Sequence, residues 1–486
     1  MDKETFKKLA GKYSAIPVFK RLLADVLTPV SLFMNVREGA SYPFLLESVE
    51  GGENLARYSF IGRNPFKVLT FDGQDTFLMK EGSGQKVQGS YFDILEEMTT
   101  EYSEPDMPDL PRLRGGAVGF SSYDTIREVE TLSEVPPDDL NLPEAVWAFY
   151  DEIFAFDHVK HQVILIKTVF IDDDMDLDQE YDEALKALNI METDALSGMP
   201  TRSEFSIDTQ NLTSNLELDE FTGMVEKGKK YIYEGDIFQV VLSQRFETSM
   251  SGDPFMLYRA LRMVNPSPYL FFLDFDDFHI VGSSPEVLVR VQDRKVTVLP
   301  IAGTRPRGKD YEEDLRYEQD LLNDPKEVAE HVMLVDLGRN DVSRVSETGS
   351  VQLERNQVIE RYSHVMHIVS EVTGKLNSES SPVDALKRCF PAGTVSGAPK
   401  IRAMQIIDEL EPNKRGIYAG AIGYFDYSGN MDTCIAIRTM VVTGNKVYIQ
   451  AGAGIVADSN PQKEFEETQN KAGALIQALS VALDIQ

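Results

Sequence analysis

Cysteine is scarce in this chain of 486 residues, which has only Cys389 and Cys434. Neither lies in a C-x-x-C pair or in G-x-C-x-G surroundings. The sequence therefore offers no ligands for a zinc cluster, no disulfide framework and no glutaminase-type nucleophile. We expect both residues to be buried and to pack as small apolar side chains.

Long apolar runs and positive charge are also lacking. No run approaches the ~18 apolar residues of a membrane span, and the start "MDKETFKKLAGKYSAIPVFK" has no uninterrupted apolar segment, which argues against a secretory signal and for a cytoplasmic protein. Lys and Arg number 48 against 79 Asp and Glu, a net charge of −31. Such a surface repels nucleic acid and anionic membranes, so neither is an expected partner. An anionic substrate would need a locally positive site.

The length and the changes in composition along the chain predict two domains. Residues 14–171 are rich in strand patterns, residues 172–217 are acidic and polar and read as a linker with one surface helix, and residues 218–480 alternate strands with helices. Near the end, residues 420–456 read as three strands joined by Ser-Gly-Asn and Thr-Gly-Asn turns, an antiparallel meander. We predict an α+β fold, a two-domain sandwich of mostly antiparallel sheets with helices packed outside.

Two predicted helices carry paired carboxylates beside an apolar face. The first opens with Asp324-Pro325 and the second with Asn460-Pro461, as N-cap and first helical residue. Each continues with Glu-x-x-Glu, whose i,i+3 spacing places both carboxylates on one stripe. Carboxylates at the edge of a core favour a hard cation such as Mg²⁺, which accepts a few carboxylates and keeps other oxygen ligands. The four residues are Glu327, Glu330, Glu464 and Glu467.

Other interpretations of these glutamates stay open. Glu327 occupies the third helical position, where a capping box is the better explanation for that residue alone. No cap explains the positions of Glu330 and Glu467. The alternative to metal binding is that these two side chains are simply exposed to solvent on the helix surface. A di-iron site would need Glu-x-x-His, whereas His331 directly follows Glu330, which ranks iron below Mg²⁺.

Further candidates lie in the meander and beside it. Arg438 is predicted in the middle strand, in line with Cys434, Ala436 and Met440, where a guanidinium needs either an anionic ligand or a structural salt bridge. The next strand ends in Ala-Gly-Ala-Gly, residues 451–454, where missing side chains let a ligand approach the backbone or simply allow close packing. Lys471 follows Glu467 by four residues and is either its ion-pair partner or a second cation for a substrate.

Six motifs in order resemble the chorismate-utilising enzymes over nearly the whole chain. They are "LLESVEGGENLARYSFIG", "GDIFQVVLSQRF", "PIAGTRPRG", "HVMLVDLGRNDVSRV", "FPAGTVSGAPK" and "AGAGIVADSNPQKEFEETQNKA". The resemblance implies that chorismate, a dianion, is held on Mg²⁺ in the C-terminal domain. It assigns Glu330 and Glu467 as metal ligands, with Glu327 and Glu464 as second-layer or water-mediated partners. The implied chorismate contacts are Gly303, Thr304, Tyr418, Arg438, Gly452, Ala453, Gly454 and Lys471.

The resemblance also implies the catalytic groups. Glu286 matches the general acid for a departing hydroxyl, and His367 the histidine of a later elimination, while Thr304 presents its hydroxyl to the substrate. His364 and the two arginines of "TRPRG", Arg305 and Arg307, are expected to be structural.

Two positions indicate the branch of the family. Relatives that add water have a lysine base where this chain has Gln239, and relatives that attack the ring with a lysine have it in place of Ala302. Neither glutamine nor alanine can do this chemistry. The implied nucleophile is ammonia, supplied by a glutamine amidotransferase subunit in a heterotetramer of two large and two small subunits. The implied products are 2-amino-2-deoxyisochorismate and then anthranilate and pyruvate, the first committed step of tryptophan biosynthesis.

The resemblance finally implies feedback inhibition by L-tryptophan in the N-terminal domain. The matching residues are Leu45, Glu47, Ser48, Pro268, Tyr269 and Leu270. Two other classes stay open: a regulator that binds tryptophan without catalysis, and a Mg²⁺-dependent phosphoryl-transfer enzyme. The intact Glu330, Glu467 and His367 argue against the first, and the absence of a G-x-x-x-x-G-K-[ST] loop argues against the second.

Overall fold

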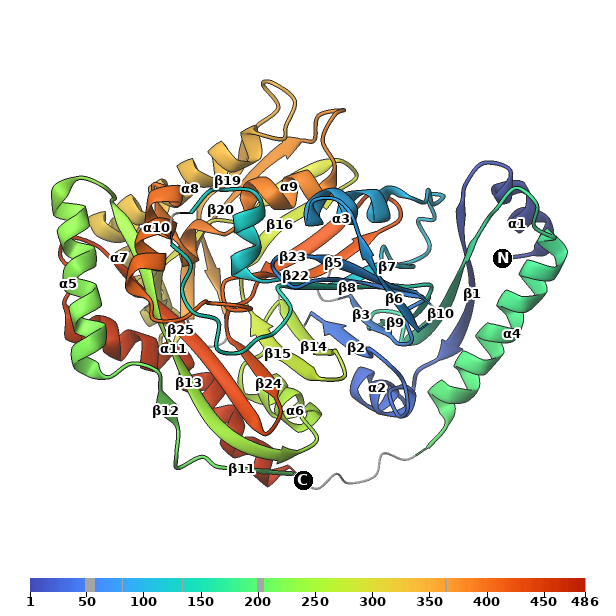
Figure 1. The fold of residues 1–486 in the computed structure, drawn as a ribbon, viewed down its shortest axis with the longest axis horizontal. Coiled ribbons are helices and arrows are strands. Elements are labelled where there is room, and N and C mark those ends of the chain that lie inside the picture. The colour runs from blue at the N-terminus through green and yellow to red at the C-terminus, as the bar shows by residue number, and fades with distance from the viewer. Residues whose placement is uncertain (49–56, 81, 133, 199–204, 363–364, 486) are drawn as a thin grey trace.

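The computed structural model describes residues 1–48, 57–80, 82–132, 134–198, 205–362 and 365–485. Its strands form a 13-stranded and a 12-stranded sheet, and every pairing between described strands is antiparallel. The helices lie outside the sheets (Figure 1). The predicted α+β sandwich of antiparallel sheets with outer helices is confirmed.

The first sheet contains, in spatial order, β1 (Ala15–Leu23), β10 (Gln162–Phe170), β9 (Glu152–Asp157), β3 (Tyr58–Gly62), β2 (Phe44–Glu47), β14 (Tyr269–Asp274), β15 (Phe278–Ser284), β24 (Thr439–Thr443), β25 (Lys446–Ile455), β13 (Gln239–Gly252) and β11 (Phe205–Ile207). Two short strands also pair with β13, namely β12 (Thr213–Ser214) and β21 (Gly397–Ala398).

The second sheet follows the order β18 (Ile301–Pro306), β20 (Val365–Lys375), β17 (Lys295–Val298), β16 (Val287–Gln292), β23 (Met431–Ile435), β22 (Ala421–Asp426), β7 (Gly116–Ser121), β8 (Ala145–Tyr150), β4 (Lys67–Phe71), β5 (Thr76–Lys80) and β6 (Ser83–Val87). The long strand β19 (Gln352–Arg361) pairs with β20.

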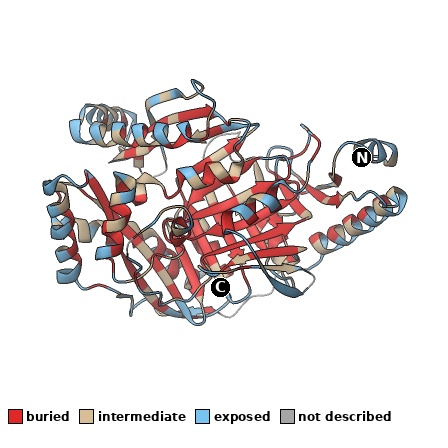
Figure 2. Cartoon of the chain, turned by 45° about the horizontal axis from the view of Figure 1, so that its top comes forward, coloured by how far each residue is buried: buried red, intermediate tan, exposed pale blue. Residues whose placement is uncertain are grey.

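Apolar side chains fill the space between the sheets and beneath the helices. Phe44, Ile164 and Phe271 of the first sheet belong to one buried cluster with Val118 and Ile422 of the second, so this cluster lies between the sheets. Burial is concentrated on the strands, whereas the outer faces of the helices are exposed (Figure 2). The helices are α1 (Lys3–Ala10), α2 (Pro29–Val36), α3 (Tyr91–Thr100), α4 (Leu177–Leu196), α5 (Leu218–Glu234), α6 (Phe255–Val264), α7 (Tyr311–Asn323), α8 (Pro325–Ser343), α9 (Pro382–Cys389), α10 (Lys400–Leu410) and α11 (Pro461–Asp484).

Both halves of the chain contribute strands to both sheets. Residues 14–171 supply one side of each sheet and residues 205–480 the other, joined by β2 with β14 in the first sheet and by β7 with β22 in the second. The segment predicted as a linker contains α4, whose Tyr181, Leu188 and Met191 are buried and which packs on β1 and β10 (Figure 1). The site described below therefore rests on a continuous double sheet.

The predicted three-stranded meander is wrong in one respect. Both predicted turns form, with left-handed glycines at Gly429 and Gly444, and they close the hairpins β22–β23 and β24–β25. The middle strand, however, is interrupted at residues 436–438, where Arg438 has φ +51°. The chain leaves the second sheet there and enters the first, because β23 pairs with β22 and β16 whereas β24 pairs with β15 and β25.

Several smaller expectations are also answered. Cys389 and Cys434 are both buried and free, as predicted. Helices α8 and α11 begin with Asp324-Pro325 and Asn460-Pro461, as predicted. Helix α5 ends at Gly235, which adopts the left-handed conformation. No helix within the described ranges combines the length and the apolar character that a membrane crossing requires.

Candidate functional site

The site lies where two neighbouring segments cross from one sheet to the other. The first crossing, between β15 and β16, carries Glu286, and the second, between β23 and β24, carries Arg438. The crossings are bonded together, since the Ile435 N–H donates to the carbonyl of Glu286 (3.0 Å) and the Ser284 hydroxyl donates to the carbonyl of Ile435 (2.7 Å). Residues that leave a strand at such a junction can present side chains beyond both sheets, which no single regular strand allows.

Arg438 is a half-buried cation without an anionic partner. Its Nη1 donates to the backbone carbonyl of Lys471 (2.9 Å), and no carboxylate of the described chain lies within ion-pair distance of it. Burial lowers the pKa of the guanidinium, and Tyr418 partly opposes this. The structural salt bridge considered for Arg438 is therefore wrong, and an anion would be stabilised here.

The glycines of β25 leave space beside this cation. A Cβ on Gly452 would lie 2.7 Å from the hydroxyl of Tyr418, and one on Gly454 would lie 2.7 Å from Nε2 of the buried Gln239. Residues two apart in a strand share a face, so Ala453 points away from the site, into the core with Leu242. Ala453 can offer a ligand only its backbone.

Lys471 joins the glycine strand to the acidic helix. Its ammonium group donates to the carbonyl of Gly452 (3.0 Å) and lies 2.8 Å from the carboxylate of Glu467. The predicted ion pair with Glu467 is therefore present. The same lysine faces the space around Gly452, so it can also meet a substrate.

A bulge positions Thr304 and His367 opposite one another. Gly303 is the extra residue between β18 and β20, with φ +72°, a conformation that glycine adopts without strain. The imidazole Nδ1 of His367 lies 3.0 Å from the Gly303 carbonyl and 3.0 Å from the Thr304 hydroxyl. Because a carbonyl only accepts, Nδ1 carries the proton and Nε2 keeps its lone pair. Burial lowers the pKa of His367, which keeps the ring neutral.

The two arginines after Thr304 are structural, as expected. Arg305 forms ion pairs with Asp320 (2.7 Å) and Asp324 (2.8 Å), and Arg307 with Asp314 (2.7 Å). His364 lies outside the described residues.

The four predicted glutamates approach one another from α8 and α11. Burial and then the neighbouring Glu327 raise the pKa of Glu330, and Glu467 adds to this. Burial also raises the pKa of Glu464, again with a contribution from Glu467. The ionised forms of Glu330 and Glu464 are thus disfavoured, which a bound cation would reverse.

The capping box predicted for Glu327 is wrong. The N–H of Asp324 donates to the carbonyl of Leu321 (3.3 Å), and the carboxylate of Glu327 instead lies 3.6 Å from Arg305. It also borders the bulge, since a Cβ on Gly303 would lie 3.1 Å from its Oε2. Glu327 therefore links the acidic helix to the bulge that holds His367.

Glu330 and Glu467 offer carboxylate oxygens, the type of donor that Mg²⁺ prefers. Within the described ranges, no group of three or more His, Cys, Asp or Glu side chains is placed so that it could hold a metal ion by itself. An open pair of glutamates is nevertheless suitable for Mg²⁺, which takes one or two carboxylates and completes its shell with water or substrate oxygens. Glu330 and Glu467 are the residues that would hold it.

Glu286 is a carboxylic acid with a pKa near neutrality. Burial raises its pKa to about 7, opposed by a hydrogen bond from the Thr394 hydroxyl to Oε1 (2.8 Å) and by Lys471. A carboxyl group with this pKa is substantially protonated at neutral pH and can donate a proton.

Two residues of the site escaped prediction. Thr394 lies within the "FPAGTVSGAPK" motif, but nothing in the sequence pairs it with Glu286, 108 positions away. Lys326 lowers the pKa of both Glu330 and Glu464. Lys326 precedes Glu330 by four residues, and this helical spacing is the sequence signal that could have indicated its effect on Glu330.

The predicted tryptophan residues lie on the adjacent strands β2 and β14, where Glu47 pairs with Leu270. Leu45 and Leu270 are buried on the side of α6, and the carboxylate of Glu47 accepts hydrogen bonds from Arg262 (2.9 Å) and Tyr258. The Tyr269 side chain lies on the opposite face, where its hydroxyl donates to Asp432 (2.7 Å). Pro268 and Ser48 are partly exposed at the strand ends.

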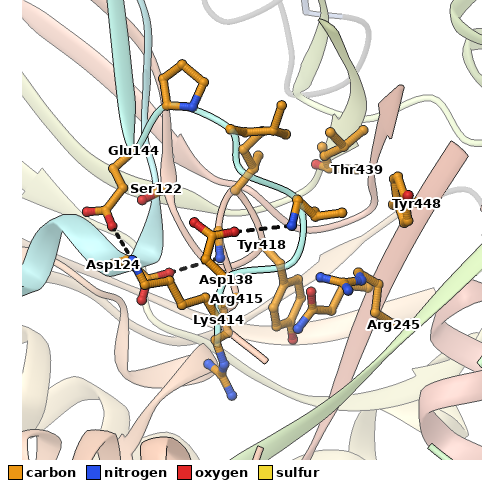
Figure 3. A pocket seen from close by; sticks show the side chains of 17 residues that line it. Ser122, Asp124, Asp138, Glu144, Arg245, Lys414, Arg415, Tyr418, Thr439 and Tyr448 are labelled. Atoms are coloured by element: carbon orange, nitrogen blue, oxygen red, sulfur yellow. Dashed lines mark hydrogen bonds and ion pairs between the residues drawn. The ribbon is translucent and has the colours of Figure 1, made fainter. Parts of the chain in front are cut away.

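A cavity of about 40 Å³ lies behind Tyr418 (Figure 3). Its three cations are already paired, Lys414 with Glu144 (2.7 Å), Arg415 with Glu411 (2.6 Å), and Arg245 with Asp139. Tyr418 is the only predicted site residue in its lining. Since its charges are balanced, this cavity does not provide the positive site that a dianion needs.

Comparison with known proteins identifies the family. The model of the chorismate binding enzymes matches residues 42–477. The chain belongs to the chorismate-binding enzyme family. Relatives in it include anthranilate synthase component 1 of Acetivibrio thermocellus, 47% identical over 99% of this chain and 98% of that protein, and that of Aquifex aeolicus, 43% identical over 99% and 98%.

Two solved structures share the fold of this chain. Anthranilate synthase component I from Streptococcus pneumoniae matches with a TM-score of 0.74 and 39% identity, covering 94% of this chain and 99% of that one. MenF, the menaquinone-specific isochorismate synthase of Escherichia coli, matches with a TM-score of 0.70 over 98% of both chains, at 20% identity. This second likeness shows the fold alone.

Proposed function

We propose that the chain is the large subunit of an anthranilate synthase, converting chorismate and ammonia into anthranilate and pyruvate with Mg²⁺. The observation that carries the proposal is the unpaired guanidinium of Arg438 beside Lys471 and Gly452, next to the mutually repelling Glu330 and Glu467. Such a site is suited to a dianion and a divalent cation together. The names of the full-length relatives support the same reaction.

Substrate binding is assigned to the groups around the glycine strand. One carboxylate of chorismate meets Arg438 and the Tyr418 hydroxyl, and the backbone of residues 452–454 approaches it closely because the glycines have no side chains. Gly303, Thr304 and Lys471 contact the remainder of the molecule. Mg²⁺ bound by Glu330 and Glu467, with Glu327 and Glu464 behind them, would stabilise negative charge on the ring carboxylate.

The first half of the reaction uses Glu286. Ammonia forms a bond to C2 of the ring, the double bonds shift, and the C4 hydroxyl departs. Glu286 donates its proton to this hydroxyl, which leaves as water, and the added amine loses a proton to give 2-amino-2-deoxyisochorismate. The hydrogen bond from Thr394 fixes the carboxyl group for this transfer.

The second half uses His367. The Nδ1 proton is held by the Gly303 carbonyl, so Nε2 is available to take the C2 proton. The electron pair of that C–H bond makes the ring aromatic, the C3–O bond breaks, and the enolpyruvyl group leaves as an enolate, which takes up a proton to become pyruvate. Burial lowers the pKa of His367, which favours the unprotonated base.

The nucleophile is assigned from two lysines that relatives have and that this chain lacks at this site. Gln239 is buried under Gly454, where a lysine could activate water, and Ala302 is buried beside the Gly303 bulge, where a lysine could attack the ring. With glutamine and alanine there, ammonia from a glutamine-hydrolysing partner is the remaining nucleophile. The name "component 1" of the relatives supports such a partner, and we propose a heterotetramer of two large and two small subunits.

Regulation is assigned to the paired strands β2 and β14. L-Tryptophan bound at Leu45, Glu47, Ser48 and residues 268–270 would inhibit the reaction from outside the chorismate site. In this scheme residues 14–171 carry the regulatory part and residues 218–480 the catalytic part, in a cytoplasmic enzyme.

The proposal is tested by incubating the purified chain with chorismate and an ammonium salt and following anthranilate fluorescence. We expect formation of anthranilate and pyruvate in equal amounts, complete loss in excess EDTA, and recovery on adding Mg²⁺. Formation of isochorismate instead of anthranilate would contradict the proposal, as would full activity in EDTA.

A further inference from the structure

Arg415 is a buried arginine on the segment between α10 and β22, and it contacts three parts of the chain that carry proposed site residues. Its side chain is only 1% exposed. The guanidinium donates to the carbonyls of Val395 (2.6 Å) and Val241 (2.8 Å) and lies 5.5 Å from the ring centre of Tyr418. Arg415 and Tyr418 both line the cavity of Figure 3. No step of the proposed reaction uses this arginine.

The contact with Val395 leads to the proposed acid. Val395 directly follows Thr394, whose hydroxyl donates to the carboxyl group of Glu286 (2.8 Å). Both residues belong to the short helical turn η2 (Gly393–Val395). A turn of three residues has little stability of its own, so contacts with its neighbours decide where the Thr394 hydroxyl lies.

The contact with Val241 leads to the glycine strand. Val241 of β13 pairs with Gly454 of β25, and its N–H donates to the carbonyl of Ser396 (2.9 Å), the residue after η2. Arg415 therefore bonds to η2 and to the strand on which η2 rests. The same guanidinium thus sets the Thr394 turn relative to the backbone that borders the proposed chorismate site.

Glu411 fixes the orientation of the guanidinium. Nε of Arg415 donates to Oε2 of Glu411 (2.9 Å) and Nη2 donates to Oε1 (2.6 Å). Oε1 also accepts hydrogen bonds from the N–H (2.8 Å) and the hydroxyl (2.9 Å) of Ser243 on β13. A planar guanidinium in a bidentate pair cannot turn without breaking these bonds, so its remaining N–H groups point in fixed directions.

We infer that Arg415 is a positioning residue for the proton transfer. Through the carbonyl of Val395 it holds the Thr394 hydroxyl in place, and this hydroxyl orients the carboxyl group of Glu286 towards the departing hydroxyl of the substrate. Arg415 acts through these neighbours and is assigned no contact with the substrate. The inference rests on the proposed function.

Arg415→Lys tests this role while keeping the charge. Lysine retains a cation beside Glu411, but its donors leave a single nitrogen and cannot reproduce the planar set of bonds to Glu411, Val395 and Val241. We expect kcat with saturating ammonium to fall by at least about tenfold, with a chorismate KM within about threefold of wild type. Steady-state anthranilate fluorescence measures both.

The pH profile separates positioning from a general loss of stability. The hydrogen bond from Thr394 and the charge of Lys471 lower the pKa of Glu286, and Lys471 is unchanged in every variant. Loosening the Thr394 turn should therefore raise this pKa and move the basic limb of kcat/KM to higher pH. In a Thr394→Val background, Arg415→Lys should move the limb no further, because the hydroxyl through which Arg415 acts is already gone.

Arg127→Lys is the matched control. Arg127 also forms a bidentate pair, with Asp408 (2.9 Å for each bond), and donates to a backbone carbonyl, that of Glu134 (2.9 Å). Neither partner belongs to the proposed site. We expect this variant to lower the melting temperature as Arg415→Lys does, and to keep kcat within about twofold and the basic limb unmoved.

A second variant covers the case in which Arg415→Lys does not fold. Arg415→Gln combined with Glu411→Gln removes both charges together, so that neither is left buried without its partner. The shorter glutamine side chain withdraws the donor from the carbonyl of Val395. We expect the same fall in kcat and the same shift of the basic limb.

The outcomes separate the two proposals. Absence of anthranilate from wild type with ammonium would overturn the proposed function, and the inference with it. If wild type is active, an unmoved basic limb in Arg415→Lys and in the double glutamine variant would overturn the inference alone. An equal shift in Arg127→Lys, or a further shift by Arg415→Lys in the Thr394→Val background, would do the same.

Discussion

Arg438 donates to the backbone carbonyl of Lys471, which anchors its guanidinium without neutralising it. The two residues come from different elements, the crossing after β23 and helix α11. A cation fixed by a neutral acceptor keeps its full charge for an incoming anion, whereas a carboxylate partner would have cancelled it. This contact distinguishes Arg438 from Lys414, Arg415 and Arg245 behind Tyr418, all of which are paired with carboxylates.

Substitution Arg438→Met should weaken chorismate binding strongly. A lost charge-assisted hydrogen bond corresponds to ~1.5–3 kcal/mol, so we expect kcat/KM for chorismate to fall by about tenfold to hundredfold, mostly through KM. The measurement is steady-state anthranilate fluorescence over a range of chorismate concentrations. The exposed Arg339→Met provides the control. An unchanged KM in Arg438→Met would remove Arg438 from the binding site.

Glu286 should produce the basic limb of the pH profile. Its proton-donating form is present below its pKa of about 7 and is lost as the pH rises through that value. We expect kcat/KM to fall ~tenfold per pH unit well above the pKa, and Glu286→Gln to abolish most activity.

Thr394 supplies a sharper check on this assignment. Its hydrogen bond lowers the pKa of Glu286, so Thr394→Val should move the basic limb to higher pH while Thr394→Ser should restore it. A limb that stays at the same pH in both variants would assign it to another group.

Local patterns predicted the elements of the site, and long-range geometry decided how they meet. The Asp-Pro and Asn-Pro starts predicted the beginnings of α8 and α11 correctly, and both Glu-x-x-Glu pairs lie within these helices, Glu327 with Glu330 and Glu464 with Glu467. The interruption at Arg438 could not be predicted, because alternating apolar residues continue through it and the change of sheet depends on β15 and β16. Likewise, Glu327 fits a capping box locally, but Arg305 of strand β18 attracts its carboxylate.

Loss of a metal ligand should be visible without catalysis. Mg²⁺ should raise the melting temperature of wild type by binding between Glu330 and Glu467, and Glu467→Gln should abolish this rise. The variant itself should be as stable as metal-free wild type, since removing one charge relieves the effect of Glu467 on Glu330. Thermal denaturation with EDTA or Mg²⁺ measures both, and Glu226→Gln on the exposed face of α5 is the control. An equal Mg²⁺ effect in Glu467→Gln would exclude Glu467 as a ligand.

His367→Ala should separate the two halves of the reaction. Addition of ammonia needs Glu286, whereas removal of the C2 proton needs the lone pair on Nε2 of His367. We expect 2-amino-2-deoxyisochorismate to accumulate and anthranilate formation to slow by ~10²-fold or more, as for other lost general bases. Chromatography of quenched reactions measures both compounds. Anthranilate at the normal rate with no intermediate would show that another group takes the proton.

Ser48→Phe should remove inhibition by L-tryptophan. Ser48 directly follows Glu47, whose carboxylate is fixed by Arg262 and Tyr258 of α6, and the buried Leu45 and Leu270 on the paired strands offer an apolar surface for an indole. A bulky ring at Ser48 would occupy the end of that surface, so we expect at least a tenfold rise (~1.4 kcal/mol) in the tryptophan concentration that halves the activity.

Inhibition requires that tryptophan bind one arrangement of the chain better than another. Helix α6 also packs on α11, so it connects this surface with the helix that carries Glu467 and Lys471. Titration of tryptophan against wild type, Ser48→Phe and the exposed control Ser249→Phe measures the effect, with tryptophan-induced thermal stabilisation as a readout independent of activity. Equal inhibition of wild type and Ser48→Phe would place the regulatory site elsewhere, and no inhibition of wild type would remove it from this chain.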